Sequence, residues 1–424
     1  MRIGFIHNAF PVLSQTFISK EMTGLQKRGL DIKIYSLFKP HPQRQANGSI
    51  TSDIPITYVL PQLSIVNLLT EHLKLLSLSP MRYLSTLSYA LISRENPALF
   101  IKTLYRFFCS KKMTKTERQD ILFHFFLAVP LASRMRKDSV TLINSHFADA
   151  AASFALLCAK LLNLPYGITA HAYDIFTPQY NLYDKFFNAE YILTCTQFNK
   201  SFFLNRFPEF NPDKFLVFYH GINTEKFKPN PQSENKENSF NILSIGRLVN
   251  KKGFSILMGA CHYLHNQEIP FKCRIIGDGP LLQPLTDLVK NLKLESKVEL
   301  TGAVPHEQIK KYYEQAHIFV LPCIVDQDGN RDGIPNVLAE AMSMQIPVIS
   351  TPISGIPELV IDNRTGLLAE SENIHDLADK ILSLYKDKKR RQNLGLLGRE
   401  YVIRHFNSEK CLDQLADFYN NLDL

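Results

Sequence analysis

The 424-residue sequence lacks several patterns that mark common classes of protein. Its seven cysteines are scattered singly without a CxxC pair, so neither a zinc site nor a disulfide framework is indicated, and an odd, dispersed set fits a reducing compartment. No stretch reaches the ~18 apolar residues that a membrane-spanning helix needs. The apolar run at residues 1–6 is too short for a signal peptide and is interpreted as a first strand. We therefore expect a cytoplasmic protein without a membrane span.

Dinucleotide-binding and metal-binding signatures are also missing. The first strand-to-helix turn has no G-x-G-x-x-G pattern, which argues against an NAD-dependent dehydrogenase. Asp326 and Asp328 have a spacing that suits a divalent ion, but we interpret them as part of a solvated loop. No cluster of His, Asp and Glu shows the spacing of metal ligands. We therefore expect neither a cofactor nor a metal ion.

The order of strand-like and helix-like segments predicts the fold class. A chain of this length exceeds the size at which one core usually keeps growing, so two domains are expected. Both halves alternate short apolar strands with helices, which is typical of parallel sheets. We predict an α/β protein with two doubly wound, Rossmann-like domains, 1–228 and 240–395, that face each other across a cleft. The polar stretch 229–239 would be the linker, and helices at 396–424 would pack back on the first domain.

Most of the net positive charge lies in one segment. Residues 60–140 contain twelve basic and five acidic residues, an excess of +7 (12 minus 5), and the whole chain carries +8. Leucines, aromatic residues and basic residues recur there at helical spacing, so we predict a helical insertion in the first domain. A local basic excess points to an anionic partner, such as a membrane surface or an acceptor. The simpler interpretation, which we favour, is a set of helices that cover the sheet with charged outer faces.

Two loops of the second half carry the residues best suited to an anionic ligand. Arg247 and Lys252 lie in a strand-to-helix loop between two glycines, where a planar guanidinium and a compact ammonium group could neutralise a diphosphate. Asp332 and Glu340 stand eight positions apart, on either side of a Gly-Ile-Pro turn. Pro335 predicts the start of a helix, and the free N–H groups at such a start favour an anion.

Five motifs of the second half occur in the order and spacing of the family 4 glycosyltransferases, and the sequence resembles that family. They are Gly246-Arg247 with Lys252-Gly253, Gly277-Asp278-Gly279-Pro280, residues 332–342, Pro347-Val-Ile-Ser, and Gly355-Ile-Pro-Glu358 with Gly366-Leu-Leu. In the first half, residues 10–17 (F-P-V-L-S-Q-T-F) and His171-Ala-Tyr-Asp174 are similar to a bacterial surface-polysaccharide branch of the colanic-acid type. One position departs from the pattern, because the family commonly has Glu where this chain has Asp332.

The resemblance implies a GT-B fold and a retaining glycosyltransferase that needs no metal. Such an enzyme moves a sugar from a nucleotide-diphosphate donor to a saccharide or lipid-linked saccharide in cell-surface polysaccharide biosynthesis. Arg247 and Lys252 would stabilise the leaving diphosphate. Asp332 and His171 would lie near the reacting sugar, and Glu340 would bind the ribose. Further contacts are implied for Gly277, Gly279, Gly333, Ile334, Pro335 and Asn336 on the donor, and for Ser14, Gln15, Tyr173 and Asp174 on the acceptor side.

Partners and location follow from the same resemblance. We expect a nucleotide-sugar donor, a saccharide or lipid-linked oligosaccharide acceptor and no nucleic acid. We also expect peripheral binding to an anionic surface at the inner face of the plasma membrane, with contributions from Lys111, Lys112 and Lys115. Two alternatives stay open: a nucleotide-sugar epimerase of the same fold, and a basic membrane-surface or anion-binding protein without catalysis. The sequence names neither the donor base and sugar nor the acceptor.

Overall fold

The computed structural model describes residues 1–12, 16–40, 54–60, 64–92, 121–177, 181–230, 239–305 and 307–422. The chain forms two compact units. Unit 1 consists of Met1–Thr194, Phe203–Val217 and Leu412–Leu424, and unit 2 consists of Cys195–Phe202 and Phe218–Cys411. Residues 218–228, which the sequence analysis assigned to the first domain, therefore belong to unit 2. Most of the predicted linker, residues 231–238, lies outside the described residues.

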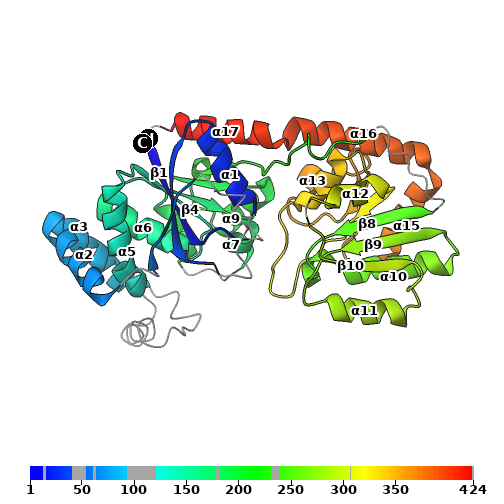
Figure 1. The fold of residues 1–424 in the computed structure, drawn as a ribbon, viewed down its shortest axis with the longest axis horizontal. Helices are drawn as coiled ribbons and strands as arrows, with labels where there is room; N and C mark the ends of the chain where they lie inside the picture. Colours follow the sequence, from blue (N-terminus) through cyan, green and yellow to red (C-terminus); the bar gives the residue numbers. More distant parts are fainter. Residues whose placement is uncertain are drawn as a thin grey trace. The chain divides into compact units, whose positions relative to one another are not determined.

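Unit 1 is built on a parallel sheet of seven strands in the order β3-β2-β1-β4-β5-β6-β7 (Figure 1). Every residue of β4 and β5 is buried, as expected for strands that helices cover on both faces. The order reverses between β1 and β4, where Ile3 pairs with Leu142, and ligands of such sheets bind beside the carboxyl ends of the strands at a reversal. The strands are β1 (Arg2–Ala9), β2 (Asp31–Phe38), β3 (Ile56–Tyr58), β4 (Leu142–His146), β5 (Tyr166–Ala170), β6 (Tyr191–Thr194) and β7 (Phe215–Val217).

The predicted helical insertion is present in unit 1. Helix α5 (Ile121–Lys137) packs on α6 (Ala150–Leu162) and on α2 (Ile65–Leu78), and α3 (Pro80–Ile92) packs on both α5 and α6 (Figure 1). Residues 93–120, which include Lys111, Lys112 and Lys115, lie outside the described residues. The other helices that lie wholly or partly in unit 1 are α1 (Thr16–Lys27), α7 (Ala172–Phe176), α8 (Leu182–Phe187), α9 (Gln197–Arg206) and α17 (Ser408–Asn420). Among the described residues, no helix combines the length and the apolar character that crossing a membrane requires.

Unit 2 is built on a second parallel sheet, with six strands in the order β10-β9-β8-β11-β12-β13. Its order reverses between β8 and β11, as the order of unit 1 does between β1 and β4, so both predicted doubly wound sheets are confirmed. The strands are β8 (Phe240–Ile245), β9 (Phe271–Ile276), β10 (Val298–Gly302), β11 (Ile318–Val320), β12 (Val348–Ser350) and β13 (Leu367–Leu368). The helices are α10 (Phe254–Asn266), α11 (Leu282–Asn291), α12 (Ile309–Gln315), α13 (Asn336–Ser343), α14 (Ile356–Leu359), α15 (Ile374–Lys386) and α16 (Lys388–His405).

Candidate active site

The loops that follow β8 and β9 pack directly against each other at the carboxyl edge of the unit 2 sheet. The N–H of Gly246 donates to the carbonyl of Ile276, and the N–H of Leu248 donates to the carbonyl of Asp278, both at 2.9 Å. A Cβ atom at Gly277 would lie 1.9 Å from the carbonyl oxygen of Gly246, and one at Gly279 would lie 2.5 Å from that of Leu248. Both positions therefore require glycine for close packing of the two loops. A donor contact at these glycines stays a prediction.

Asp332 lies between two lysine side chains of the loop after β8. The Nζ atom of Lys251 is 3.1 Å from Asp332 Oδ1, and the Nζ atom of Lys252 is 2.6 Å from Oδ2. Burial favours the neutral form of Asp332, but the two ammonium groups outweigh it and hold the pKa of the carboxyl below its ordinary value. Burial likewise opposes the charge of Lys252, yet Asp332 raises its pKa. Asp332 and Lys252 are therefore charged at neutral pH, and Lys251 completes an ionic cluster with them.

Arg247 differs from the two lysines because its side chain is exposed. In the described part of the chain its guanidinium group has no ion-pair partner. It belongs to the same loop as Lys251 and Lys252, so the loop offers one uncompensated cation beside two that share a carboxylate.

Asp326 and Asp328 each accept a hydrogen bond from an N–H of their own loop, at 2.8 Å. That arrangement accords with a turn, and the expectation that no metal is needed stays a prediction.

Glu340 is a buried carboxylate on helix α13, which begins after the Gly-Ile-Pro turn. Pro335 caps the helix in an extended conformation, so the helix starts one residue later than the sequence analysis expected. The side chain of Glu340 is 7% exposed, and its Oε2 atom accepts a hydrogen bond of 3.0 Å from the hydroxyl of Tyr313. Tyr313 lies on α12, so a residue from another helix fixes the orientation of the carboxylate. A buried carboxylate held in this way can accept further hydrogen bonds from hydroxyl groups of a ligand.

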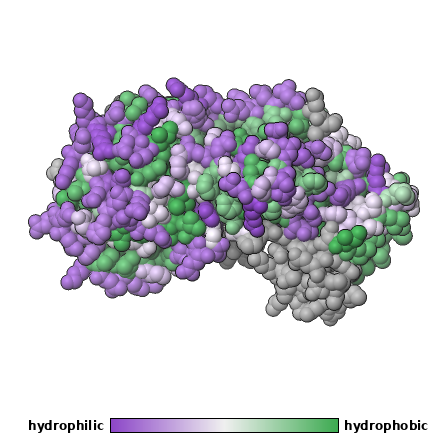
Figure 2. All heavy atoms as spheres, turned by 180° about the vertical axis from the view of Figure 1, so that it is seen from behind, coloured by the Kyte–Doolittle hydropathy of each residue, from purple (hydrophilic) through white to green (hydrophobic). Residues whose placement is uncertain are grey.

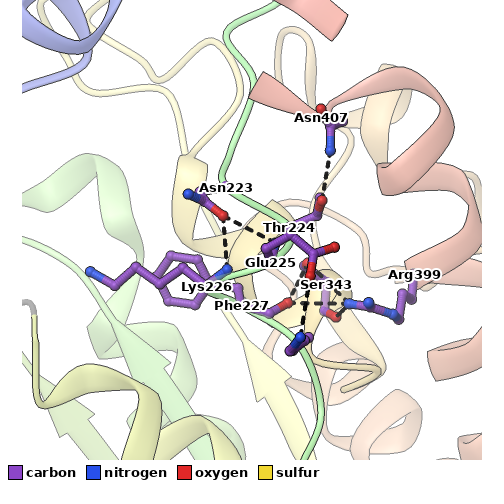
Figure 3. Close-up of polar contacts among 9 residues, drawn as sticks. Asn223, Thr224, Glu225, Lys226, Phe227, Ser343, Arg399 and Asn407 are labelled. Atoms are coloured by element: carbon purple, nitrogen blue, oxygen red, sulfur yellow. Dashed lines mark hydrogen bonds and ion pairs between the residues drawn. The ribbon is translucent and has the colours of Figure 1, made fainter. Parts of the chain in front are cut away.

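A polar network holds the other end of α13 (Figure 3). The guanidinium of Arg399, on α16, donates to the carbonyl oxygens of Ser343 and Phe227, and the hydroxyl of Ser343 donates to the same Phe227 carbonyl. Ser343 is the last residue of α13, where a cation is favourable because the carbonyl end of a helix is partly negative. The ring of Phe227 meets Tyr313 edge to face, at 5.9 Å between centroids. The segment before the linker therefore contacts the residue that orients Glu340.

In unit 1, His171 follows β5 and lies in a row of buried histidines. The ring of His146 stacks on those of His7 and His171, with centroids 5.0 and 5.8 Å apart. His7, His146 and His171 lie at the carboxyl ends of β1, β4 and β5, which are neighbours in the sheet. The Nε2 atom of His146 is 3.2 Å from Oε1 of Glu21, on α1. Burial, together with the charge of His146, lowers the pKa of His7 well below its ordinary value.

The acceptor-side residues differ in their access to solvent. Tyr173 is 52% exposed, whereas Asp174 is fully buried and accepts a hydrogen bond of 3.0 Å from the N–H of His171. Burial, and then the nearby charge of Asp149, raises the pKa of Asp174 to about 8. The geometry supports a role for Asp174 in fixing the backbone of His171 rather than a direct contact with an acceptor. Ser14 and Gln15 lie outside the described residues, so their acceptor role stays a prediction.

The structure joins some of the predicted residues directly and adds others. Lys252 meets Asp332, and Gly246 meets Gly277, while Gly333 and Ile334 form the half-buried turn before α13. Lys251 was not predicted from the sequence, although it precedes Lys252, and neither was His146, although it ends β4 much as His171 follows β5. Tyr313 was not predicted either, because its hydrogen bond with Glu340 depends on the tertiary fold and leaves no signal in the sequence.

Comparison with known proteins identifies the family. Residues 94–226 match the description "Glycosyltransferase Family 4", and residues 225–401 match "Glycosyl transferases group 1". The chain belongs to these glycosyltransferases. The second match contains every donor-side residue named above, and the first contains His171, Tyr173 and Asp174. The resemblance drawn from the motifs is thereby confirmed.

Relatives of this glycosyltransferase extend over its whole length. It is 26% identical to a protein of Escherichia coli named as a colanic acid biosynthesis glycosyltransferase, WcaL, over 100% of both chains. In fold it is similar to a glycosyltransferase from Rickettsia africae, with a TM-score of 0.69 and 18% identity over 99% of this chain and 98% of the other. It is also similar to the Anabaena protein HepE, determined in complex with UDP and glucose, with a TM-score of 0.69 and 15% identity over 100% of both chains. These structures confirm the GT-B fold.

Proposed function

We propose that this glycosyltransferase moves a sugar from a nucleotide-diphosphate donor to a saccharide or lipid-linked saccharide in cell-surface polysaccharide biosynthesis. Transfer proceeds with retention at the anomeric carbon and without a metal ion. The name of WcaL supports the polysaccharide assignment, because that relative matches this chain from end to end. The UDP and glucose bound to HepE support a nucleotide-sugar donor. We place the reaction in the cytoplasm, where nucleotide sugars would be available to it.

The observation that carries the proposal is the group of three cations in the loop after β8. Lys251 and Lys252 share the carboxylate of Asp332, and Arg247 adds an exposed guanidinium to the same loop. Three positive charges face one negative charge at the carboxyl edge of a parallel sheet, where ligands of such sheets bind. An excess of positive charge suits a diphosphate, which brings several oxygens that accept charge-assisted hydrogen bonds.

The arrangement also suits the chemistry of the reaction. As the bond between the sugar and the diphosphate breaks, negative charge grows on the phosphate oxygens, and preorganised cations lower the energy of that transition state. Phosphate oxygens that enter the site compete with Asp332 for the ammonium groups of Lys251 and Lys252. The carboxylate of Asp332 is then free to accept a hydrogen bond from a sugar hydroxyl. Glu340, held by Tyr313, accepts hydrogen bonds from the ribose. We assign no residue as general base.

Nucleotide binding by the full-length chain tests the proposal. Calorimetry with UDP, GDP and ADP should show binding of one of the three, and the matching monophosphate should bind more weakly because it brings less charge to the cations. Arg247→Ala should weaken diphosphate binding while leaving the thermal unfolding temperature unchanged, because the side chain is exposed. A folded protein that binds none of the three diphosphates would contradict the donor assignment. Sugar analysis with donor alone separates transfer from epimerisation, which changes the sugar without an acceptor.

A membrane partner belongs to the proposal as well. A lipid-linked acceptor would be presented at the inner face of the plasma membrane, and the basic excess of residues 60–140 favours an anionic surface. The lysines first predicted to contribute, Lys111, Lys112 and Lys115, lie outside the described residues. Reversing their charges should weaken binding to anionic vesicles at low salt, and that expectation stays a prediction.

A further inference from the structure

Helices α2 and α3 carry most of the exposed apolar side chains of the described residues. Ten of the seventeen large apolar side chains that are exposed there belong to these two helices. Val66 on α2 is 72% exposed and Met81 on α3 is 79% exposed. Figure 2 shows hydrophobic atoms at the edge of the molecule where these helices lie. Scattered exposed apolar residues need no explanation, but such a gathering marks an interaction site.

The exposed side chains form one stripe on each helix. On α2, Val66, Leu69, Leu73 and Leu76 follow the spacing i, i+3, i+7, i+10, which places them along one side of a helix. On α3, Met81, Leu84 and Leu91 occupy the matching positions, with Ser88 as the remaining member. We call these two stripes the α2–α3 face. It contains no charged residue, because the charged residues of both helices fall between the stripe positions.

Both helices are fixed so that the α2–α3 face stays outward. A different stripe of α2, formed by Leu68, His72 and Leu75, is buried. The Nδ1 atom of His72 lies 2.7 Å from the hydroxyl of Tyr83 on α3, and its Nε2 atom lies 3.0 Å from the carbonyl oxygen of Phe126 on α5. Turning either helix to bury the exposed stripe would break this buried network, which costs free energy for each group left unpaired. The face is therefore a permanent feature of unit 1.

The charges around the face favour an anionic partner. The one acidic residue within Ile65–Ile92, Glu71, is paired with Lys74 at 2.8 Å. Arg82 is exposed on α3. The sequence that follows directly, residues 93–120, contains seven basic and three acidic residues, an excess of +4 (7 minus 3). A specific protein interface carries about one hydrogen bond per 100–200 Å², whereas stripes whose only polar side chain is Ser88 offer little to such a partner. A lipid interface requires only apolar surface bordered by positive charge.

We propose that the α2–α3 face inserts into the interfacial layer of an anionic lipid bilayer. The two helices then lie along the membrane plane, with their apolar stripes among the upper parts of the acyl chains and with Lys74 and Arg82 near the lipid headgroups. This proposal rests on the proposed function only in explaining why a glycosyltransferase would reach a lipid-linked acceptor. It differs from attraction by the basic segment alone, because apolar insertion persists when salt screens the charges.

Vesicle flotation of the full-length chain tests the proposal. The vesicles contain phosphatidylcholine with or without phosphatidylglycerol. We expect wild type to float with the anionic vesicles and to stay partly bound at about 1 M salt, where exposed charges are screened beyond about 3 Å. The double variant Leu69→Asn/Leu73→Asn should lower vesicle partitioning by about tenfold or more, since both side chains lose their apolar transfer free energy. Leu396→Asn, at an exposed apolar position on α16, is the matched control and should bind as wild type.

Three outcomes would overturn the proposal. Wild type that stays in the soluble fraction with anionic lipid has no membrane-binding face. If light scattering shows that wild type is a dimer without lipid and that Leu69→Asn/Leu73→Asn is a monomer, the face binds a second copy of the chain. A double variant with unchanged flotation and a lowered unfolding temperature assigns it to another segment of the chain. Nucleotide calorimetry on the same samples separates this test from the proposed function, because donor binding should be equal in wild type and variant.

Discussion

The ammonium group of Lys252 lies 2.6 Å from Oδ2 of Asp332. The two residues belong to the loops after β8 and β11, which are neighbouring strands of the unit 2 sheet. Each favours the charged form of the other. Asp332, proposed to contact the sugar, and Lys252, proposed to bind the diphosphate, therefore form one ion pair. A change at either residue will therefore affect both the stability of unit 2 and donor binding.

Asp332→Asn should destabilise the protein at neutral pH by about 3 kcal/mol, because Lys251 and Lys252 then lose the carboxylate that pairs them. The folded-state pKa of Asp332 is depressed, so its stabilising contribution is complete above the ordinary value of 3.8 and is lost as the pH falls through the lower folded value. Urea unfolding at neutral pH and at acid pH measures both effects. Asp379→Asn, at an exposed position on α15, is the control. Equal stability of Asp332→Asn and wild type at neutral pH would show that the ion pair contributes nothing.

Arg247→Ala and Lys252→Met should each reduce turnover by about two orders of magnitude, the scale seen when one group that stabilises developing charge is lost. Arg247→Ala is the cleaner test because its side chain is exposed, whereas Lys252→Met leaves Asp332 without its nearest cation. Lys290→Met, on the exposed side of α11, should leave turnover unchanged. Steady-state kinetics with the donor found by calorimetry provides the measurement. Full activity of Arg247→Ala would remove that residue from the diphosphate site.

Tyr313→Phe should weaken nucleotide binding by about tenfold, because Glu340 loses the hydroxyl that orients it and a charge-assisted hydrogen bond is worth about 1.5–3 kcal/mol. Glu340→Gln should weaken it in the same way, by removing the charge. Calorimetry with inorganic pyrophosphate is the matched control, since pyrophosphate has no ribose and should bind both variants as it binds wild type. Parallel losses for nucleotide and pyrophosphate would exclude a ribose-specific role for Glu340.

Turnover should survive treatment with EDTA, because Arg247, Lys251 and Lys252 supply positive charge where other transferases use a metal ion. The assay compares the rate before and after chelation and after adding manganese or magnesium. Activity that disappears with EDTA and returns with either ion would contradict the prediction. The loop of Asp326 and Asp328 would then be the first place to substitute.

The fold could be predicted from the sequence because its signals are local. Short buried strands, glycine at the ends of helices and the alternation of strand with helix mark a parallel sheet without knowledge of tertiary contacts. The exposed stripe of α2 could not be predicted in this way. The helix has apolar residues along more than half of its circumference, and only the packing of Leu68 and Leu75 toward α5 decides which part is buried. Apolar residues at helical spacing were recognised in the insertion, but the expected membrane contact was assigned to its basic residues.

The site shows the same division between local and tertiary information. Lys252, Asp332 and Glu340 could be named because loop position and motif spacing point to a ligand. Their partners could not, because the hydrogen bond between Tyr313 and Glu340 joins two separate helices, α12 and α13, and depends on the tertiary fold. Asp174 shows a different limit. The resemblance implied an acceptor contact for this residue, whereas the structure buries its carboxyl, and burial raises its pKa to about 8.

The contact between Phe227 and Tyr313 has a consequence for how this chain can vary in evolution. Residues 229–239 have a composition that tolerates insertion and deletion, so their length is free to drift. Phe227, just before this linker, is constrained, because its ring contacts Tyr313, the residue that orients Glu340. Its carbonyl also accepts hydrogen bonds from Arg399 and Ser343. Selection on nucleotide affinity should therefore extend to Phe227, through its contact with Tyr313, while the length of the linker that follows is free to change.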